Sequence, residues 1–127
     1  MLELTNTEQI IMKCIWSLGE DVTVADLLKC LEEKYQKEYA RTTISVFMSY
    51  LRDKGYVTYG KKGHAYVYRP LVSEKEYQRE QMKRYLERCF DGNIVEFVGT
   101  VLENEKPSKG ECEAIRGMLD QYARQEC

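Results

Sequence analysis

The sequence predicts a mainly α-helical fold that contains one small β-hairpin, and three patterns indicate it. At five expected helix starts, a Ser, Thr or Asn is followed three positions later by an acid, the pairing that caps the start of a helix. Apolar residues recur at the three- and four-residue spacing of amphipathic helices. Directly after Gly55 the period falls to two, which is typical of β-strands.

Three helices are expected before that change of period. The first begins at the Thr5–Glu8 pair and ends at Gly19, and the second begins at the Thr23–Asp26 pair. The third runs from about Arg41 to Lys54. Its apolar stripe consists of Ile44, Phe47, Met48 and Leu51. The other side of this third helix is polar and is free to contact a partner.

A β-hairpin is expected next, because residues 56–59 and 64–68 alternate in the manner of strands and are rich in tyrosine and valine. Between them lies Gly60–Gly63, whose glycines and lysines predict a four-residue loop. Pro70 closes the second strand. The predicted hairpin therefore carries two lysines at its tip.

Three more helices are expected in the tail, starting at the pairs Ser73–Glu76, Asn93–Glu96 and Ser108–Glu111. Residues 94–102 are apolar on nearly every side, so other apolar groups must surround this helix. The tail is too short to bury such a surface within one chain, and a symmetric dimer would bury it. The residues expected at the dimer interface are Tyr85, Leu86, Cys89, Phe90, Ile94, Phe97, Val98, Val101, Leu102, Ile115, Met118, Leu119 and Tyr122.

Three helices followed by a hairpin is the element order of a winged helix-turn-helix domain, whose third helix enters the major groove of DNA. Residues 37–69 hold seven Lys or Arg against two Asp or Glu, although the whole chain has a formal charge of -2. This local excess of positive charge indicates a polyanion partner. We expect a DNA-binding domain over residues 1–71 and a helical dimerisation domain over residues 72–127.

The exposed side of the third helix and the hairpin tip form the expected DNA-binding surface. Thr42, Thr43 and Ser45 can hydrogen-bond to base edges, and Val46 offers an apolar contact to a thymine methyl group. The tip lysines would contact phosphates. The expected DNA-binding residues are Lys37, Arg41, Thr42, Thr43, Ser45, Val46, Ser49, Tyr50, Lys61, Lys62 and His64. In a dimer, two such helices would read a palindromic operator.

Composition argues against several other classes of protein. No stretch approaches the ~20 apolar residues of a membrane span and no signal peptide is evident, so we expect a cytoplasmic protein without membrane insertion. The five cysteines lie far apart and His64 is the only histidine, so no metal site and no other cofactor is expected. Without a nucleophile motif, the chain is not expected to be an enzyme.

The sequence also resembles a known family, the penicillinase and methicillin-resistance repressors, whose relatives include copper-responsive repressors. The resemblance spans essentially the whole chain and is carried by residues 39–44, 51–55 and 64–70, which look like the family's recognition helix, the end of that helix and the second wing strand. It implies a DNA-reading role for Thr43. The family's C-terminal cysteine cluster, found in the copper-responsive branch, is absent, which argues against copper sensing.

The same resemblance implies binding to dyad operators as a dimer, and often control of β-lactamase genes. Where the resistance repressors have Ser-Pro-Lys, this chain has Ala40-Arg41-Thr42, and Ser45 replaces a longer side chain, so its operator need not be the same. The resistance repressors are inactivated by cleavage of an Asn-Phe bond through a membrane-bound sensor protease pathway. The aligned bond here is Thr100–Val101, which differs in both residues.

Alternative functions remain open from the sequence alone. A winged-helix module that binds another protein through its third helix is compatible with the low overall basicity, and steep salt dependence of duplex binding would separate the two. A redox-responsive regulator is a further alternative, with Cys127 as the most accessible thiol. A thiol hydrolase that pairs a cysteine with His64 is the enzymatic alternative.

Overall fold

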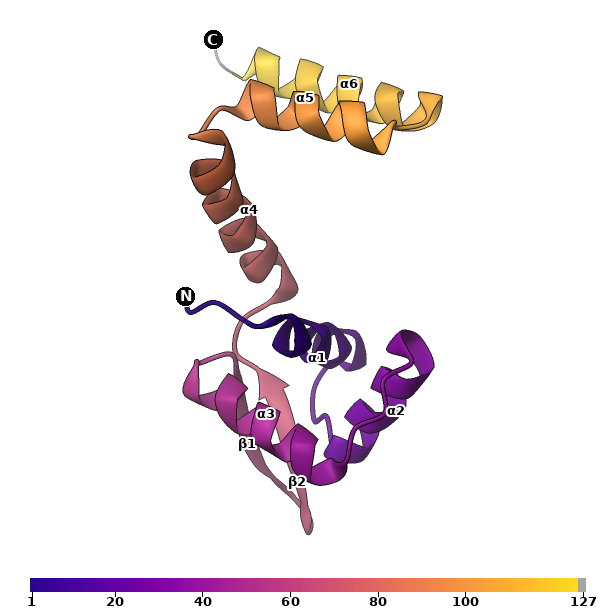
Figure 1. Ribbon diagram of the computed structural model, residues 1–127, viewed down its shortest axis with the longest axis vertical. Helices are drawn as coiled ribbons and strands as arrows, with labels where there is room; N and C mark the ends of the chain where they lie inside the picture. Colours follow the sequence, from indigo (N-terminus) through magenta and orange to yellow (C-terminus); the bar gives the residue numbers. More distant parts are fainter. Residues whose placement is uncertain (126–127) are drawn as a thin grey trace. The chain divides into compact units, whose positions relative to one another are not determined.

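The computed structural model describes residues 1–125, and this part of the chain forms six α-helices and one β-hairpin (Figure 1). The elements are α1 (Asn6–Leu18), α2 (Val24–Tyr35), α3 (Arg41–Asp53), β1 (Val57–Lys62), β2 (Ala65–Pro70), α4 (Glu74–Phe90), α5 (Ile94–Glu105) and α6 (Lys109–Arg124). The predicted fold class, mainly helical with a winged helix-turn-helix and a helical C-terminal region, is confirmed. No helix within residues 1–125 is long and apolar enough to cross a membrane.

The chain packs into two compact units, residues 1–81 and 82–127. The boundary lies after Gln81, whereas the sequence suggested a boundary after Leu71. The first turns of α4 join the first unit because Tyr77 is buried there and its ring centroid lies 5.4 Å from that of Trp16 on α1. The Trp16 indole N–H also donates to the Val72 carbonyl at 2.8 Å, which ties the segment before α4 to α1.

Helix starts follow the predicted capping pairs. The Thr5 hydroxyl accepts from the Glu8 backbone N–H at 3.2 Å, and the Glu8 carboxylate accepts from the Thr5 N–H at 2.8 Å. Equivalent reciprocal bonds are present at the starts of α2, α4 and α6, and Asn93 accepts from the Glu96 N–H at α5. At α3, by contrast, the N-cap residue Ala40 provides no side-chain cap.

The core of the first unit lies where α1, α2 and α3 meet the base of the hairpin (Figure 1). Ile44, Met48 and Leu51 are buried as the stripe on α3 predicted, whereas Phe47 is half-buried. Beside them, Glu8 is a buried acid, 1% exposed, whose carboxylate lies 2.6 Å from the Lys54 ammonium. This ion pair joins the start of α1 to the end of α3.

The hairpin differs from the prediction at its tip. Gly60, Lys61 and Lys62 belong to β1, and the turn is only two residues, Gly63 and His64, because Lys62 pairs with Ala65. Gly63 has φ 65°, and glycine at the first position of a two-residue turn is typical of type II′. The predicted four-residue loop is therefore wrong. An isolated bridge between Val22 and Tyr68 fastens the hairpin to the segment before α2.

The second unit is built differently, because none of its side chains in residues 82–125 is buried. It contains an aromatic cluster in which the Phe90 and Phe97 centroids lie 5.2 Å apart and Tyr85 packs against both rings. Large apolar side chains on α5 and α6 remain exposed.

Candidate nucleic-acid interface

The outward side of α3 presents the short polar side chains that the sequence predicted for it. Thr42, Thr43 and Ser45 are exposed, and Val46 is 49% exposed among them. All four lie in the first half of the helix, where their side chains point away from the buried stripe. The structure thus places them together on one accessible surface.

The start of α3 is suited to a phosphate group. Its N-cap residue, Ala40, offers the first backbone N–H groups no side-chain acceptor, and its first turn contains no acid. Such N–H groups and the positive end of the helix dipole favour an anion. The predicted cations Arg41, at the first helical position, and Lys37, in the loop before it, are both exposed.

Lys61 and Lys62, which the sequence placed together at the hairpin tip, lie on opposite faces of the hairpin. Lys61 pairs with Tyr66 and so shares a face with it, and its ammonium lies 5.1 Å from the Tyr66 ring centroid. Lys62 is on the other face, where its ammonium lies 3.4 Å from the Asp21 carboxylate. Lys61 is therefore free of acidic partners among the described residues, whereas Lys62 is engaged by Asp21.

Asp21 acts as an anchor for the hairpin. The Arg69 guanidinium donates to its carboxylate at 2.7 Å, and this bond, with the added attraction of Lys62, lowers the pKa of Asp21. The sequence did not single out this contact, because the two cations on the hairpin are far from Asp21 along the chain.

A polar hollow of about 280 Å³ separates α3 from the hairpin, and we call it the tyrosine hollow. Its lining residues are Ser45, Ser49, Arg52, Tyr59, Tyr66 and Tyr68. The Arg52 guanidinium lies 5.1 Å from the Tyr59 ring centroid, and Tyr59 packs against both other rings. Serine and tyrosine hydroxyls together with a guanidinium are groups that commonly contact the phosphates and sugars of DNA.

Four lining residues of this hollow were missed by the sequence reasoning: Arg52, Tyr59, Tyr66 and Tyr68. The alternation of tyrosines was visible, but it indicated strands only. Their common face follows from the register, in which Tyr59 pairs with Tyr68 and Lys61 with Tyr66. A four-residue loop would have given a different pairing.

Two other predicted residues lie at the edges of this surface. His64 occupies the exposed turn of the hairpin. Tyr50 lies on the opposite flank of α3 from the tyrosine hollow, with its ring edge-on to Phe47 at 6.1 Å between centroids. The structure therefore does not bring Tyr50 together with Ser45 and Ser49.

The predicted dimerisation residues are accessible or half-buried in the second unit. Half-buried are Leu86, Phe90, Phe97, Val98 and Ile115. Exposed are Tyr85, Cys89, Ile94, Val101, Leu102, Met118, Leu119 and Tyr122. The Thr100–Val101 bond lies in the interior of α5, where both residues are exposed and the Thr100 hydroxyl donates to the Glu96 carbonyl at 2.9 Å.

The cysteines of the first unit are packing residues. Cys14 and Cys30 are buried, and burial, with the neighbouring Cys30 thiol, raises the pKa of Cys14 to about 12. A thiol with such a pKa is a poor nucleophile near neutral pH. Cys127, the redox candidate, lies outside the described residues. Within residues 1–125 no group of three His, Cys, Asp or Glu side chains could hold a metal ion.

Comparison with known proteins agrees with the resemblance. The family model described as penicillinase repressor matches residues 4–121. The penicillinase repressor of Bacillus licheniformis is 24% identical over 120 residues, covering 94% of this chain and 91% of the relative. The methicillin resistance regulatory protein MecI of Staphylococcus aureus (strain N315) is 24% identical over 118 residues, covering 93% of this chain and 94% of the relative.

Two solved structures are also similar to this chain. The DNA-binding domain of the repressor BlaI is 25% identical, covers 59% of this chain and 88% of its own, and has a TM-score of 0.49. A MarR family protein from Bacillus stearothermophilus is similar in fold, with a TM-score of 0.52 at 18% identity, over 98% of this chain and 76% of its own. Because the family model covers nearly the whole sequence, the chain belongs to the penicillinase repressor family.

Proposed function

We propose that this chain is a transcriptional repressor that binds a dyad-symmetric DNA operator as a homodimer and acts by occupying the promoter. The observation that carries the proposal is that α3 has no side-chain cap at its start and presents exposed Thr and Ser side chains there, and that Ser45 and Ser49 of the same helix also line the tyrosine hollow. The names of the family and of its relatives, all repressors or regulatory proteins, support the same function.

In this proposal, α3 lies in the major groove with its N-terminal half at the base edges. Thr43 reads bases, and Thr42, Ser45 and Val46 complete the reading surface. Arg41, Lys61 and the Arg52 side of the tyrosine hollow contact phosphates, which contribute most of the affinity and make binding depend on salt. Lys62 contributes less than Lys61, because Asp21 neutralises part of its charge.

The homodimer is proposed because the second unit leaves its apolar residues uncovered. Val95 is 82% exposed and Ile94 64% exposed on α5, and Leu119 is 60% exposed on α6. A contiguous apolar surface of this kind marks an interaction site. Twofold pairing would cover the same residues on both chains and would place two α3 helices on the two half-sites of one operator.

The test is binding of the purified protein to duplexes selected from a random pool, measured at several salt concentrations. Thr43→Ala is expected to weaken operator binding by about 1–3 kcal/mol and to leave random duplexes nearly unaffected. Thr58→Ala is the matched control, since Thr58 is exposed on the face of the hairpin turned away from Tyr59 and Tyr68. Equal losses on operator and random DNA would contradict the role of Thr43.

The lysines provide a second comparison in the same assay. Lys61→Ala is expected to weaken binding to all sequences and to reduce the slope of log binding constant against log salt concentration by about one. Lys62→Ala is expected to have a smaller effect on both quantities. A chain that stayed monomeric at micromolar concentration and ignored duplexes at low salt would contradict the whole proposal. Such a result would favour a winged-helix module that binds protein.

Release of repression by proteolysis at Thr100–Val101 is part of the proposal only through the family resemblance. Because this bond lies in the interior of α5, cleavage requires the helix to open locally. The check is an immunoblot during induction. Full-length protein that persists while the target gene, proposed to be of the β-lactamase type, is switched on would exclude this route.

A further inference from the structure

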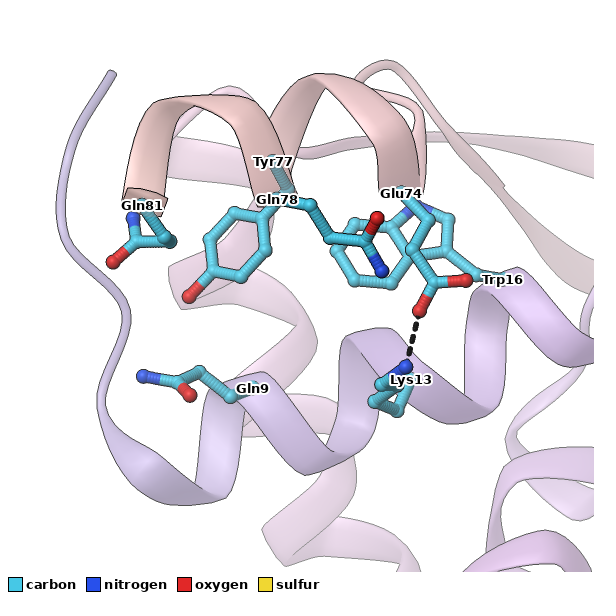
Figure 2. A pocket seen from close by; sticks show the side chains of 7 residues that line it. All are labelled: Gln9, Lys13, Trp16, Glu74, Tyr77, Gln78 and Gln81. Carbon is cyan, nitrogen blue, oxygen red and sulfur yellow. Dashed lines mark hydrogen bonds and ion pairs between the residues drawn. The ribbon is translucent and has the colours of Figure 1, made fainter. Parts of the chain in front are cut away.

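A second hollow lies within the first unit, away from the proposed DNA-binding surface. It has a volume of about 350 Å³ and is formed by one side of α1 and the first turns of α4 (Figure 2). Its lining residues are Gln9, Lys13, Trp16, Glu74, Tyr77, Gln78 and Gln81. This volume is within the range of pockets that hold small molecules, at its lower end.

Two aromatic rings form the apolar wall of this hollow, and both are held in place. Trp16 is fixed by the hydrogen bond from its indole N–H to the Val72 carbonyl. Tyr77 is buried and packs edge-on against Tyr56, with 5.9 Å between ring centroids. Because these rings are already positioned, a planar aromatic ligand could stack beside them with little loss of side-chain freedom.

Figure 2 shows Lys13 and Glu74 at one end of the hollow, Gln9 and Gln81 at the other, and the Gln78 side chain between them. At one end, the Lys13 ammonium is hydrogen-bonded to the Glu74 carboxylate, so the two charges neutralise each other. At the other end, the Gln81 side-chain nitrogen is buried and has no hydrogen-bond partner among the described residues. A buried donor without an acceptor is costly, and a ligand acceptor in the hollow would remove that cost once the partly exposed Gln81 side chain turns its amide toward it.

From this arrangement we propose that the hollow between α1 and α4 binds a small, neutral, planar aromatic molecule that carries a carbonyl-type acceptor. The ring lies beside Trp16 and Tyr77, and the acceptor receives the Gln81 N–H. The ligand is neutral, because a single amide donor would not compensate the hydration that a charged group loses when it is buried.

Binding at this place has a consequence that rests on the proposed function. The wall formed by Tyr77 and Gln81 belongs to α4, the helix that continues into the second unit. A ligand that prefers one position of these α4 turns over another shifts the balance between them. We expect it to change how a dimer presents its two α3 helices and thereby to weaken duplex binding.

The test uses benzamide as the probe and the full chain as the protein. Trp16 is the only tryptophan in the sequence, so its fluorescence reports on this hollow alone, and calorimetry provides an independent measurement. We expect saturable binding of benzamide and much weaker binding of cyclohexanecarboxamide, whose ring is not planar, and of ethylbenzene, which has no acceptor.

Two matched variants identify the donor. Gln81→Leu is expected to weaken benzamide binding by roughly three- to tenfold, the effect of one lost hydrogen bond. Gln121→Leu changes the same residue type at an exposed position of α6, outside this hollow, and it is expected to keep benzamide affinity within about twofold. No saturable binding, or equal losses in both variants, would overturn the proposed site.

The regulatory consequence is measured separately, with the selected operator in the presence of saturating benzamide. A several-fold loss of duplex affinity in the wild-type chain, reduced in Gln81→Leu, is expected. An unchanged affinity would overturn the coupling. A chain that binds benzamide but no duplex at all would contradict the proposed function and leave the ligand site standing.

Discussion

The two units of this chain differ in how they use their apolar residues. In residues 1–81, side chains such as Ile11, Leu27 and Leu51 are completely buried within one chain. In residues 82–125, no side chain is buried, although α5 is the most continuously apolar segment of the sequence. The first unit therefore buries its own core, whereas we propose that the second unit buries its apolar side chains in a dimer. Under this proposal, stability and association depend on different parts of the same short chain.

The contrast between the two units predicts that they behave differently when they are separated. We expect a fragment of residues 1–81 to fold alone, with a cooperative thermal transition whose midpoint does not depend on protein concentration, because its core is complete. A fragment of residues 82–127 is expected to be unfolded when dilute and to gain helix as concentration rises. Circular dichroism at several concentrations measures both. A concentration-independent transition in the second fragment would refute the contrast.

A smaller effect comes from the same substitution made once in each unit. Leu27 on α2 is 0% exposed and Leu119 on α6 is 60% exposed. Leu27→Ala is expected to lower the free energy of unfolding of the 1–81 fragment by about 2–5 kcal/mol, through lost burial and the cavity left behind. Denaturant unfolding of that fragment measures the change.

Leu119→Ala, in contrast, is expected to act on association. The Leu119 side chain is already exposed in the single chain, so the stability of the monomer should change little. The dimer dissociation constant is expected to rise, on the order of tenfold or more, because the substitution removes apolar surface from the proposed interface. Analytical ultracentrifugation of the full chain measures it. If Leu119→Ala left the dimer unchanged, α6 would lie outside the proposed interface.

The sequence predicted the local features of both units well, because they depend on neighbouring residues. Each predicted pair of a Ser, Thr or Asn with an acid three positions later caps a helix, since the bonds join residues close in sequence. The hairpin tip was predicted wrongly, because Gly60 is as acceptable in an exposed two-stranded ribbon as in a loop. That misplacement shifted the predicted pairing by four residues, so that Tyr59 would have paired with His64 and not with Tyr68.

Contacts between distant residues were beyond such reasoning. The residues next to Lys62 in the sequence do not indicate that its ammonium pairs with the Asp21 carboxylate. They also do not indicate that Lys61, unlike Lys62, has no acidic partner among the described residues. The contact between the Tyr77 and Trp16 rings was also not predictable from neighbouring residues. Because of this contact, the first unit ends within α4 and not before it. These contacts depend on how the elements pack together, which periodicity and capping do not specify.

Two glutamates, one in each unit, hold the same position in a capping box. Glu8 caps α1 with Thr5, and Glu111 caps α6 with Ser108. Both pKa values are lowered, but for different reasons. Burial alone would raise the pKa of Glu8, and the hydrogen bonds from Lys54 and Thr5 outweigh it. At exposed Glu111 the bonds from Ser108 are sufficient.

Glu8→Gln is therefore expected to destabilise the 1–81 fragment by about 1–3 kcal/mol at neutral pH, because the Lys54 ammonium loses its charged partner. Since the folded state lowers the pKa of Glu8, its contribution is present above the ordinary glutamate pKa and disappears as the pH falls through the lower folded value. The difference in unfolding free energy between wild type and Glu8→Gln should thus shrink on acidification.

Glu111→Gln in the full chain should produce a smaller change, because water already solvates that carboxylate. Denaturant unfolding across this pH range decides the matter, and a Glu8→Gln deficit that stayed constant into acid would show that the ion pair with Lys54 does not stabilise the first unit.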